Sequence, residues 1–151
     1  MRIVMGCDNA AFRLKEIIKE FLWEKGIQVE DLGCESQEDL TAYPLIAQRV
    51  CERIQESGGT LRGLLFCGTG LGMCITANKF KGIRAGVCHD IYSAERSVLS
   101  NDANVLCMGA RVIGEELAKR IIDCWLPLTF RDGPSTSKIR EIAKIEEQNL
   151  V

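Results

Sequence analysis

Two rhythms of hydrophobic and polar residues alternate along this chain. Five short runs rich in Ile, Val, Leu and Met are typical of strands, and they cover residues 2–7, 27–32, 64–67, 83–87 and 105–108. Between and after these runs, apolar residues recur at the spacing of an amphipathic helix. This spacing predicts helices from residue 14 to Gly26, from Pro44 to the Gly58–Gly59 pair, and over residues 73–80, 91–99, 114–125 and 138–148.

Strands that alternate with helices predict an α/β fold, because parallel strands need a crossover connection and a helix usually provides it. We therefore expect a Rossmann-like three-layer sandwich, in which helices cover both faces of one five-stranded parallel sheet. With 151 residues the chain has the size of one domain. Residues 1–151 are accordingly expected to form a single domain that ends in a C-terminal helix.

Ligands bind such a sheet beside the carboxyl ends of its strands. In this sequence these ends fall at residues 6–9, 33–34, 67–70, 88–90 and 109–111. The third of them continues into a glycine loop, LLFCGTGLG at residues 64–72. Its glycines, Gly68, Gly70 and Gly72, leave backbone N–H groups exposed ahead of a helix, and this geometry binds phosphate, carboxylate or a developing oxyanion.

A nucleotide-binding loop is one interpretation of these glycines. The Walker phosphate-loop pattern does not occur in the sequence. A dinucleotide fingerprint fits better, since Asp90 ends the following strand about 20 residues on, where a ribose-binding acid is expected. However, Met73 stands in the place of the third glycine, and the loop follows the third strand rather than the first.

The role of Cys67 distinguishes between two functions of this loop, phosphate binding and catalysis. It is either one more core cysteine among eight or a functional thiol, placed where the loop N–H groups would stabilise a thiolate. Such a thiolate can act as a base or as a nucleophile. A nucleophilic cysteine normally needs a histidine partner, and His89 is the single histidine, so proton abstraction is the more natural role. His89 itself is expected to be a locally hydrogen-bonded residue.

The composition of the chain limits the classes of partner that it is expected to bind. The chain has 19 basic and 21 acidic residues and a net charge of -2, so no broad attraction to nucleic acid or to a membrane surface is expected. The cysteines form no C-x-x-C pair, which argues against a metal site. No apolar run approaches the ~20 residues of a membrane helix, and the short apolar opening is unlike a signal peptide. We therefore expect a cytoplasmic protein with reduced thiols that binds small molecules or copies of itself.

Several ordered motifs resemble those of the ribose-5-phosphate isomerase B and galactose-6-phosphate isomerase family. They are GCD at residues 6–8, CGTGLG at 67–72, ANK at 77–79, GIRA at 82–85, YSA at 92–94, NDANV at 101–105 and GARVIG at 109–114. The match stays in register over nearly the whole chain. The resemblance implies an aldose–ketose isomerase that acts on a small phosphorylated sugar, such as ribose 5-phosphate or a related tetrose, pentose or hexose phosphate. It implies no metal or cofactor, and a site shared between the subunits of a homodimer or a dimer of dimers.

The resemblance also implies roles for individual residues. Cys67 would be the base that moves a proton between C1 and C2 through a cis-enediolate, and Thr69 and the N–H groups of Gly68, Gly70 and Gly72 would form the anion hole. Asp8 would handle sugar hydroxyls, although an Asx turn explains the same residue. Asn101 would hold a sugar hydroxyl, and Arg111 would help to bind the phosphate.

The chain also departs from the family's pattern. Asn9 and Ser100 replace two histidines, of which the one at position 100 is the usual ring-opening group. Near the C-terminus, Lys138 replaces a phosphate-binding arginine, and an ammonium does not reproduce a bidentate guanidinium. The segment 134–137 either caps the last helix or offers N–H groups and hydroxyls to a phosphate.

These departures leave two questions open. Tyr43 either reaches the pocket or packs at a dimer interface. The loss of the ring-opening histidine matters less for a tetrose phosphate, which cannot close a furanose ring. The alternative function is a family member that binds a sugar phosphate or nucleotide without turnover.

Overall fold

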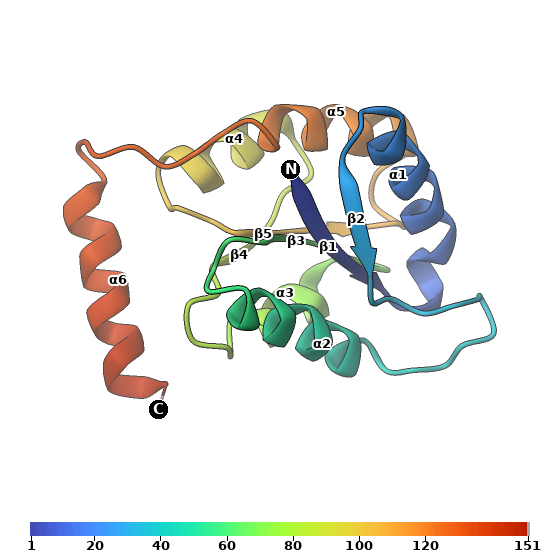
Figure 1. Ribbon diagram of the computed structural model, residues 1–151, viewed down its shortest axis with the longest axis horizontal. Helices are drawn as coiled ribbons and strands as arrows, with labels where there is room; N and C mark the ends of the chain where they lie inside the picture. Colours follow the sequence, from blue (N-terminus) through green and yellow to red (C-terminus); the bar gives the residue numbers. More distant parts are fainter. Residues whose placement is uncertain (151) are drawn as a thin grey trace.

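The computed structural model describes residues 1–150, and within them five strands form one sheet (Figure 1). The strands are β1 (Arg2–Cys7), β2 (Gln28–Asp31), β3 (Arg62–Cys67), β4 (Ala85–Val87) and β5 (Val105–Gly109). Their order across the sheet is β2-β1-β3-β5-β4, and every neighbouring pair is parallel. The expected parallel five-stranded sheet is therefore confirmed, and all carboxyl ends of the strands lie at one edge.

Helices cover both faces of the sheet, as the alternation of strands and helices predicts. The helices are α1 (Phe12–Glu24), α2 (Tyr43–Glu56), α3 (Leu71–Ala77), α4 (Ile91–Leu99), α5 (Glu115–Trp125) and α6 (Thr136–Asn149), and a 3₁₀ helix over Asn9–Ala11 precedes α1. One apolar core lies between the sheet and α1, α4 and α5, and a second lies between the sheet and α2 and α3. Figure 1 shows these three layers from the side.

The bounds of α3 and β4 are set by a glycine cap and by the side chain of Asn78. Gly70 takes a left-handed conformation (φ 79°) and caps α3, so this helix begins at Leu71 rather than at residue 73. It ends at Ala77 because the Asn78 amide exchanges two hydrogen bonds with the Ala85 backbone, N–H to Oδ1 and Nδ2 to O, each 2.9 Å long. The same contact explains why β4 begins at Ala85 and not at residue 83.

The terminal helix α6 stands apart from the three layers, beside the β4 edge of the sheet (Figure 1). No residue of α6 is buried. It touches the rest of the chain through a hydrogen bond from the Gly82 N–H to Glu146 Oε1 (2.9 Å) and along a cavity of about 520 Å³ that Ile142 and Ile145 help to line. Within residues 1–150, no helix is both long enough and apolar enough to cross a membrane.

Candidate active site

Cys67 is the last residue of β3, and its side chain is enclosed with only 5% exposed. Its Sγ accepts the Gly70 N–H at 3.0 Å, because the loop folds back over the end of the strand. The N–H groups of Gly68 and Thr69 have no hydrogen-bond partner in the described part of the chain. One backbone donor is therefore directed at the sulfur, and two more are free for a ligand beside it.

The glycines of this loop let three neighbours approach it closely. A Cβ atom on Gly72 would lie 2.5 Å from Tyr43 Cε2, and one on Gly70 would lie 2.9 Å from the Met108 carbonyl carbon. On Gly68 it would lie 3.2 Å from a guanidinium nitrogen of Arg111. Real Cβ atoms avoid such distances, so glycine is required for the Tyr43 ring and the β5 backbone to pack against the loop.

Thr69 lies at the exposed tip of the loop. Its Oγ1 accepts the Leu71 N–H at 3.3 Å, which orients the hydroxyl along the start of α3. Behind it, Gly109 approaches so closely that a Cβ there would lie 2.6 Å from Thr69 Cα. The loop is thus held between α3 on one side and the end of β5 on the other.

Asp8 follows β1, the strand next to β3, and begins the 3₁₀ helix. Its Oδ1 accepts the Ala10 N–H at 3.2 Å, so the expected Asx turn is present. Burial raises the pKa of the Asp8 carboxyl above its ordinary value, against the opposing effects of the Ala10 and Ala11 N–H groups and the Arg111 charge. Asn9 follows directly in the same turn.

Arg111 reaches the glycine loop from the segment after β5. The Ala110 N–H donates to Cys67 O (2.9 Å) and the Arg111 N–H donates to Gly68 O (3.0 Å), which fixes the two segments side by side. The guanidinium is exposed, and no carboxylate within residues 1–150 forms an ion pair with it. A mobile anion can therefore take the place of an internal partner.

The structure brings together most of the site residues expected from the sequence at the carboxyl edge of the sheet, and it separates three from them. Ser100 caps the far end of α4, and Asn101 precedes Asn104, whose carbonyl accepts the Gly63 N–H at the beginning of β3. A six-residue strand spans about 16 Å, so Asn101 lies at the opposite edge of the sheet from Cys67. Lys138 lies exposed in the first turn of α6.

Comparison with known proteins identifies the family of this chain. The model of the family described as Ribose/Galactose Isomerase matches residues 3–142. The chain belongs to this family. It is 46% identical to "D-erythrulose-4-phosphate isomerase" of Pectobacterium atrosepticum (98% of this chain, 97% of the relative) and 45% identical to "Ribose-5-phosphate isomerase B" of Escherichia coli (97% of each). The solved structure of Clostridium thermocellum ribose-5-phosphate isomerase B superposes with a TM-score of 0.93 at 40% identity, covering 98% of this chain and 99% of that one.

Membership of the ribose/galactose isomerase family makes this chain an aldose–ketose isomerase. The dinucleotide interpretation loses its main support as well. The Asp90 carboxylate, which would have bound a ribose, caps α4 by accepting the Ser93 N–H at 2.7 Å. The glycine loop of this isomerase is therefore explained by its family and not by a nucleotide fingerprint.

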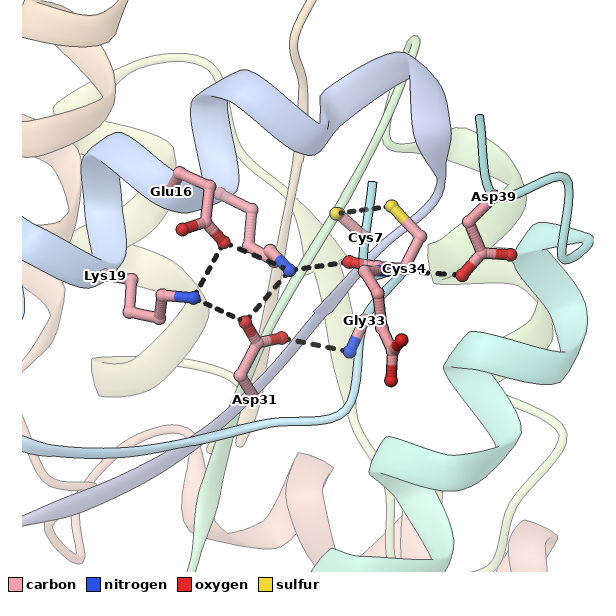
Figure 2. Close-up of polar contacts among 9 residues, drawn as sticks. Cys7, Glu16, Lys19, Asp31, Gly33, Cys34 and Asp39 are labelled. Carbon is pink, nitrogen blue, oxygen red and sulfur yellow. Dashed lines mark hydrogen bonds and ion pairs between the residues drawn. The ribbon is translucent and has the colours of Figure 1, made fainter. Parts of the chain in front are cut away.

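A buried polar cluster under the site of this isomerase was not expected from the sequence (Figure 2). Lys15 is almost fully buried, and its Nζ contacts Cys34 O (2.7 Å) and Asp31 Oδ2 (2.9 Å). Asp31 Oδ1 accepts the Gly33 N–H (3.0 Å), and the Sγ atoms of Cys34 and Cys7 lie 3.4 Å apart. These contacts fix the start of the loop that leads to Tyr43. The one available signal was that Lys15 lies beside Leu14 on the apolar stripe of its helix.

His89 is hydrogen-bonded locally, as expected. Its Nε2 accepts the Gly109 N–H at 2.8 Å. In the described residues, no three His, Cys, Asp or Glu side chains lie close enough together to hold a metal ion.

Proposed function

We propose that this isomerase interconverts the aldose and ketose forms of a short phosphorylated sugar through a cis-enediolate, with Cys67 as the base. The observation that carries the proposal is the position of the Cys67 thiol at a strand end, enclosed and directly beside free backbone donors. In the proposed reaction the Cys67 thiolate removes the proton from C2 of the aldose and returns it to C1. The negative charge that develops on the sugar oxygen faces the N–H groups of Gly68 and Thr69.

We assign to Asp8 the transfer of protons between the sugar hydroxyls in the proposed reaction. A carboxyl group whose pKa is raised by burial is better suited than an ordinary aspartate to give a proton to one sugar oxygen and accept a proton from its neighbour. Because Arg111 lies across Gly68 and forms no ion pair within residues 1–150, its guanidinium is suited to hold the phosphate of the same substrate.

We propose a tetrose 4-phosphate as the preferred substrate. Ser100 has no imidazole that could open a sugar ring, and a tetrose with a phosphate on its terminal oxygen cannot form a furanose. Two relatives at 46% identity are named D-erythrulose-4-phosphate isomerases, which supports this choice. The names of other relatives contain ribose 5-phosphate. Isomerisation of that sugar would require ring opening, for which this chain lacks the usual histidine.

The active form is proposed to be a homodimer whose partner supplies Ser100, Asn101 and Lys138 to the site. This proposal is supported by the separation of these residues from Cys67 within one chain. It is also supported by the large apolar side chains exposed next to the site, at Leu71 (56% exposed) and Ile75 (63%) on α3.

Proton exchange at the reacting carbons tests the base directly. The protein is incubated in deuterated water with D-erythrulose 4-phosphate and, separately, with ribose 5-phosphate, and deuterium incorporation is followed by NMR. We expect Cys67→Ala to lower exchange and turnover by about 10²–10⁴-fold, the usual contribution of a general base, while the fold is retained. Cys67→Ser serves as the matched control, because it keeps the size of the side chain but not its acidity.

Three results would contradict these assignments. If Cys67→Ala exchanged as fast as the wild type, Cys67 would not be the base. If ribose 5-phosphate had the higher kcat/KM, the tetrose preference would be wrong. Tight binding of several sugar phosphates without any exchange would favour a binding protein without turnover.

A further inference from the structure

His89 stands where backbone pairing between β4 and β5 ends. The last ladder bond runs from the Cys88 N–H to Cys107 O (3.1 Å). Beyond it, β4 leaves the sheet while β5 continues to Gly109. The buried Gly109 N–H therefore has no backbone acceptor on this side, and the His89 ring supplies one at 2.8 Å.

This contact determines where the proton of the neutral ring lies. A backbone N–H can only donate, so His89 Nε2 must present its lone pair. The proton of the neutral imidazole is then on Nδ1. His89 makes this contact on the β4 side of β5, whereas Cys67 lies on β3, the strand on the other side of β5.

Gly109 packs directly against the glycine loop. A Cβ on Gly109 would lie 2.6 Å from the Thr69 Cα and carbonyl carbon, and a Cβ on Gly70 would lie 3.2 Å from the Gly109 nitrogen. The nitrogen that His89 holds therefore lies close beside Gly70, whose own N–H donates to Cys67 Sγ at 3.0 Å. Two residues, Gly109 and Gly70, lie between the imidazole and the sulfur.

We propose that His89 is a positioning residue for the isomerisation. By holding the Gly109 N–H, it fixes the backbone that sets Thr69 and Gly70, and through them the Cys67 thiol and the anion hole. The inference rests on the proposed function, because it assigns His89 a role in the reaction of that site.

Two substitutions separate this role from simple packing. In His89→Gln the side-chain Oε1 can take the place of Nε2 as the acceptor, whereas His89→Leu fills a similar volume without one. A displaced catalytic group typically costs up to 10²-fold in rate. We expect His89→Leu to lower kcat on D-erythrulose 4-phosphate by about 10- to 100-fold with KM changed less than about threefold, and His89→Gln to restore most of the loss. Equal kcat losses in both variants, or wild-type kcat in His89→Leu, would overturn the proposal.

The single histidine makes an independent measurement simple. In ¹⁵N-labelled protein, the His89 ring should show the Nδ1–H tautomer, with Nε2 unprotonated, in the absence of substrate. The Gly70 amide signal should shift in His89→Leu and stay near its wild-type position in His89→Gln. An Nε2–H tautomer, or a Gly70 signal that does not respond, would contradict the proposal. These readouts need no turnover, so they remain decisive even if Cys67→Ala shows that another residue is the base.

Discussion

Three glycines shape this site, because the absence of a Cβ atom at each of them lets a neighbouring residue pack closely. Gly68, Gly70 and Gly72 each face a neighbour that a Cβ would meet, and the three neighbours come from different parts of the chain. Arg111, Met108 and Tyr43 are thereby brought to one loop of five residues. The sequence pattern LLFCGTGLG showed that the backbone is bare there, but it did not show which side chains use the space.

Gly72→Ala tests this argument at one residue. We expect a loss of about 1–3 kcal/mol in unfolding free energy, because the new methyl group would lie 2.5 Å from the Tyr43 ring and must displace it. Chemical denaturation measures the loss, and the double variant with Tyr43→Ala should show a smaller effect of the glycine substitution than the single variant does.

Gly133→Ala is the matched control, since Gly133 is exposed, a Cβ there would meet only Arg131 O, 4.0 Å away, and its φ lies outside the left-handed region. It should change the unfolding free energy by less than about 0.5 kcal/mol. An effect of Gly72→Ala as small as that of the control would mean that Tyr43 moves aside freely.

Elements are joined in this structure by polar groups as well as by the two apolar cores. The ion pair of Lys15 with Asp31 joins α1 to the end of β2. Figure 2 labels Asp31 and its neighbours Lys19 and Gly33. Burial acts to raise the pKa of the Asp31 carboxyl, but hydrogen bonds from Lys15, the Gly33 N–H and Lys19 hold it below its ordinary value. The pKa of Lys15 is raised, because its pairing with Asp31 outweighs the opposite effect of burial.

The pH dependence of stability follows from the lowered pKa of Asp31 and the raised pKa of Lys15. The stabilisation from Asp31 is present above its unfolded pKa of about 3.9 and is lost as the pH falls through its lower folded value. The stabilisation from Lys15 is complete below about pH 10.4 and is lost as the pH rises through its folded value. We expect Asp31→Asn to lower the unfolding free energy by about 3 kcal/mol at pH 7, and by clearly less below pH 4.

Urea denaturation across this pH range measures the difference. Glu116→Gln is the control, because Glu116 pairs with Lys119 on the surface, with 80% of the Glu116 side chain exposed, and should matter little at any pH. A loss for Asp31→Asn that is independent of pH would show that its cause is packing and not charge.

The sequence predicted the elements well where local signals and burial agree. The helix over residues 91–99 and the strand over 2–7 have the expected bounds. The bounds of α3 and β4 differ because the Gly70 cap and the Asn78 contact with Ala85 depend on atoms brought together by folding. Lys15 was missed for a related reason, since its place on the apolar stripe of its helix does not reveal the oxygens of Asp31 and Cys34, which only folding brings beside it.

For the site as a whole, the rule that ligands bind at carboxyl ends of strands correctly placed Asp8, Cys67 and Arg111 at one edge. The same rule says nothing about Ser100, Asn101 and Lys138, which lie at the other edge or on α6. In the proposed homodimer, their place in the site depends on how two copies of the chain meet. A hydrophobic pattern records what is buried within one chain and carries little information about such an arrangement.

Mixing two inactive variants tests whether the site is shared. Cys67→Ala and Asn101→Ala should each have little activity, because each lacks one group in both sites of its homodimer. After dissociation and reassociation of an equal mixture, half of the dimers contain both variants, and one of their two sites is intact. We expect about one quarter of wild-type activity to return. No recovery in mixed dimers, verified by native mass spectrometry, would show that each chain builds its site alone.

The opposite-edge arrangement of these residues has a consequence for how a sugar would enter and leave. In the proposed dimer, the two-fold axis sets the carboxyl edge of each sheet against the amino edge of the other, so their strands run in opposite directions. A sugar held between them is enclosed by two rigid bodies rather than covered by a hinged lid. Product release would then require a small opening of the subunit interface. Turnover would therefore depend on how often the two subunits move apart.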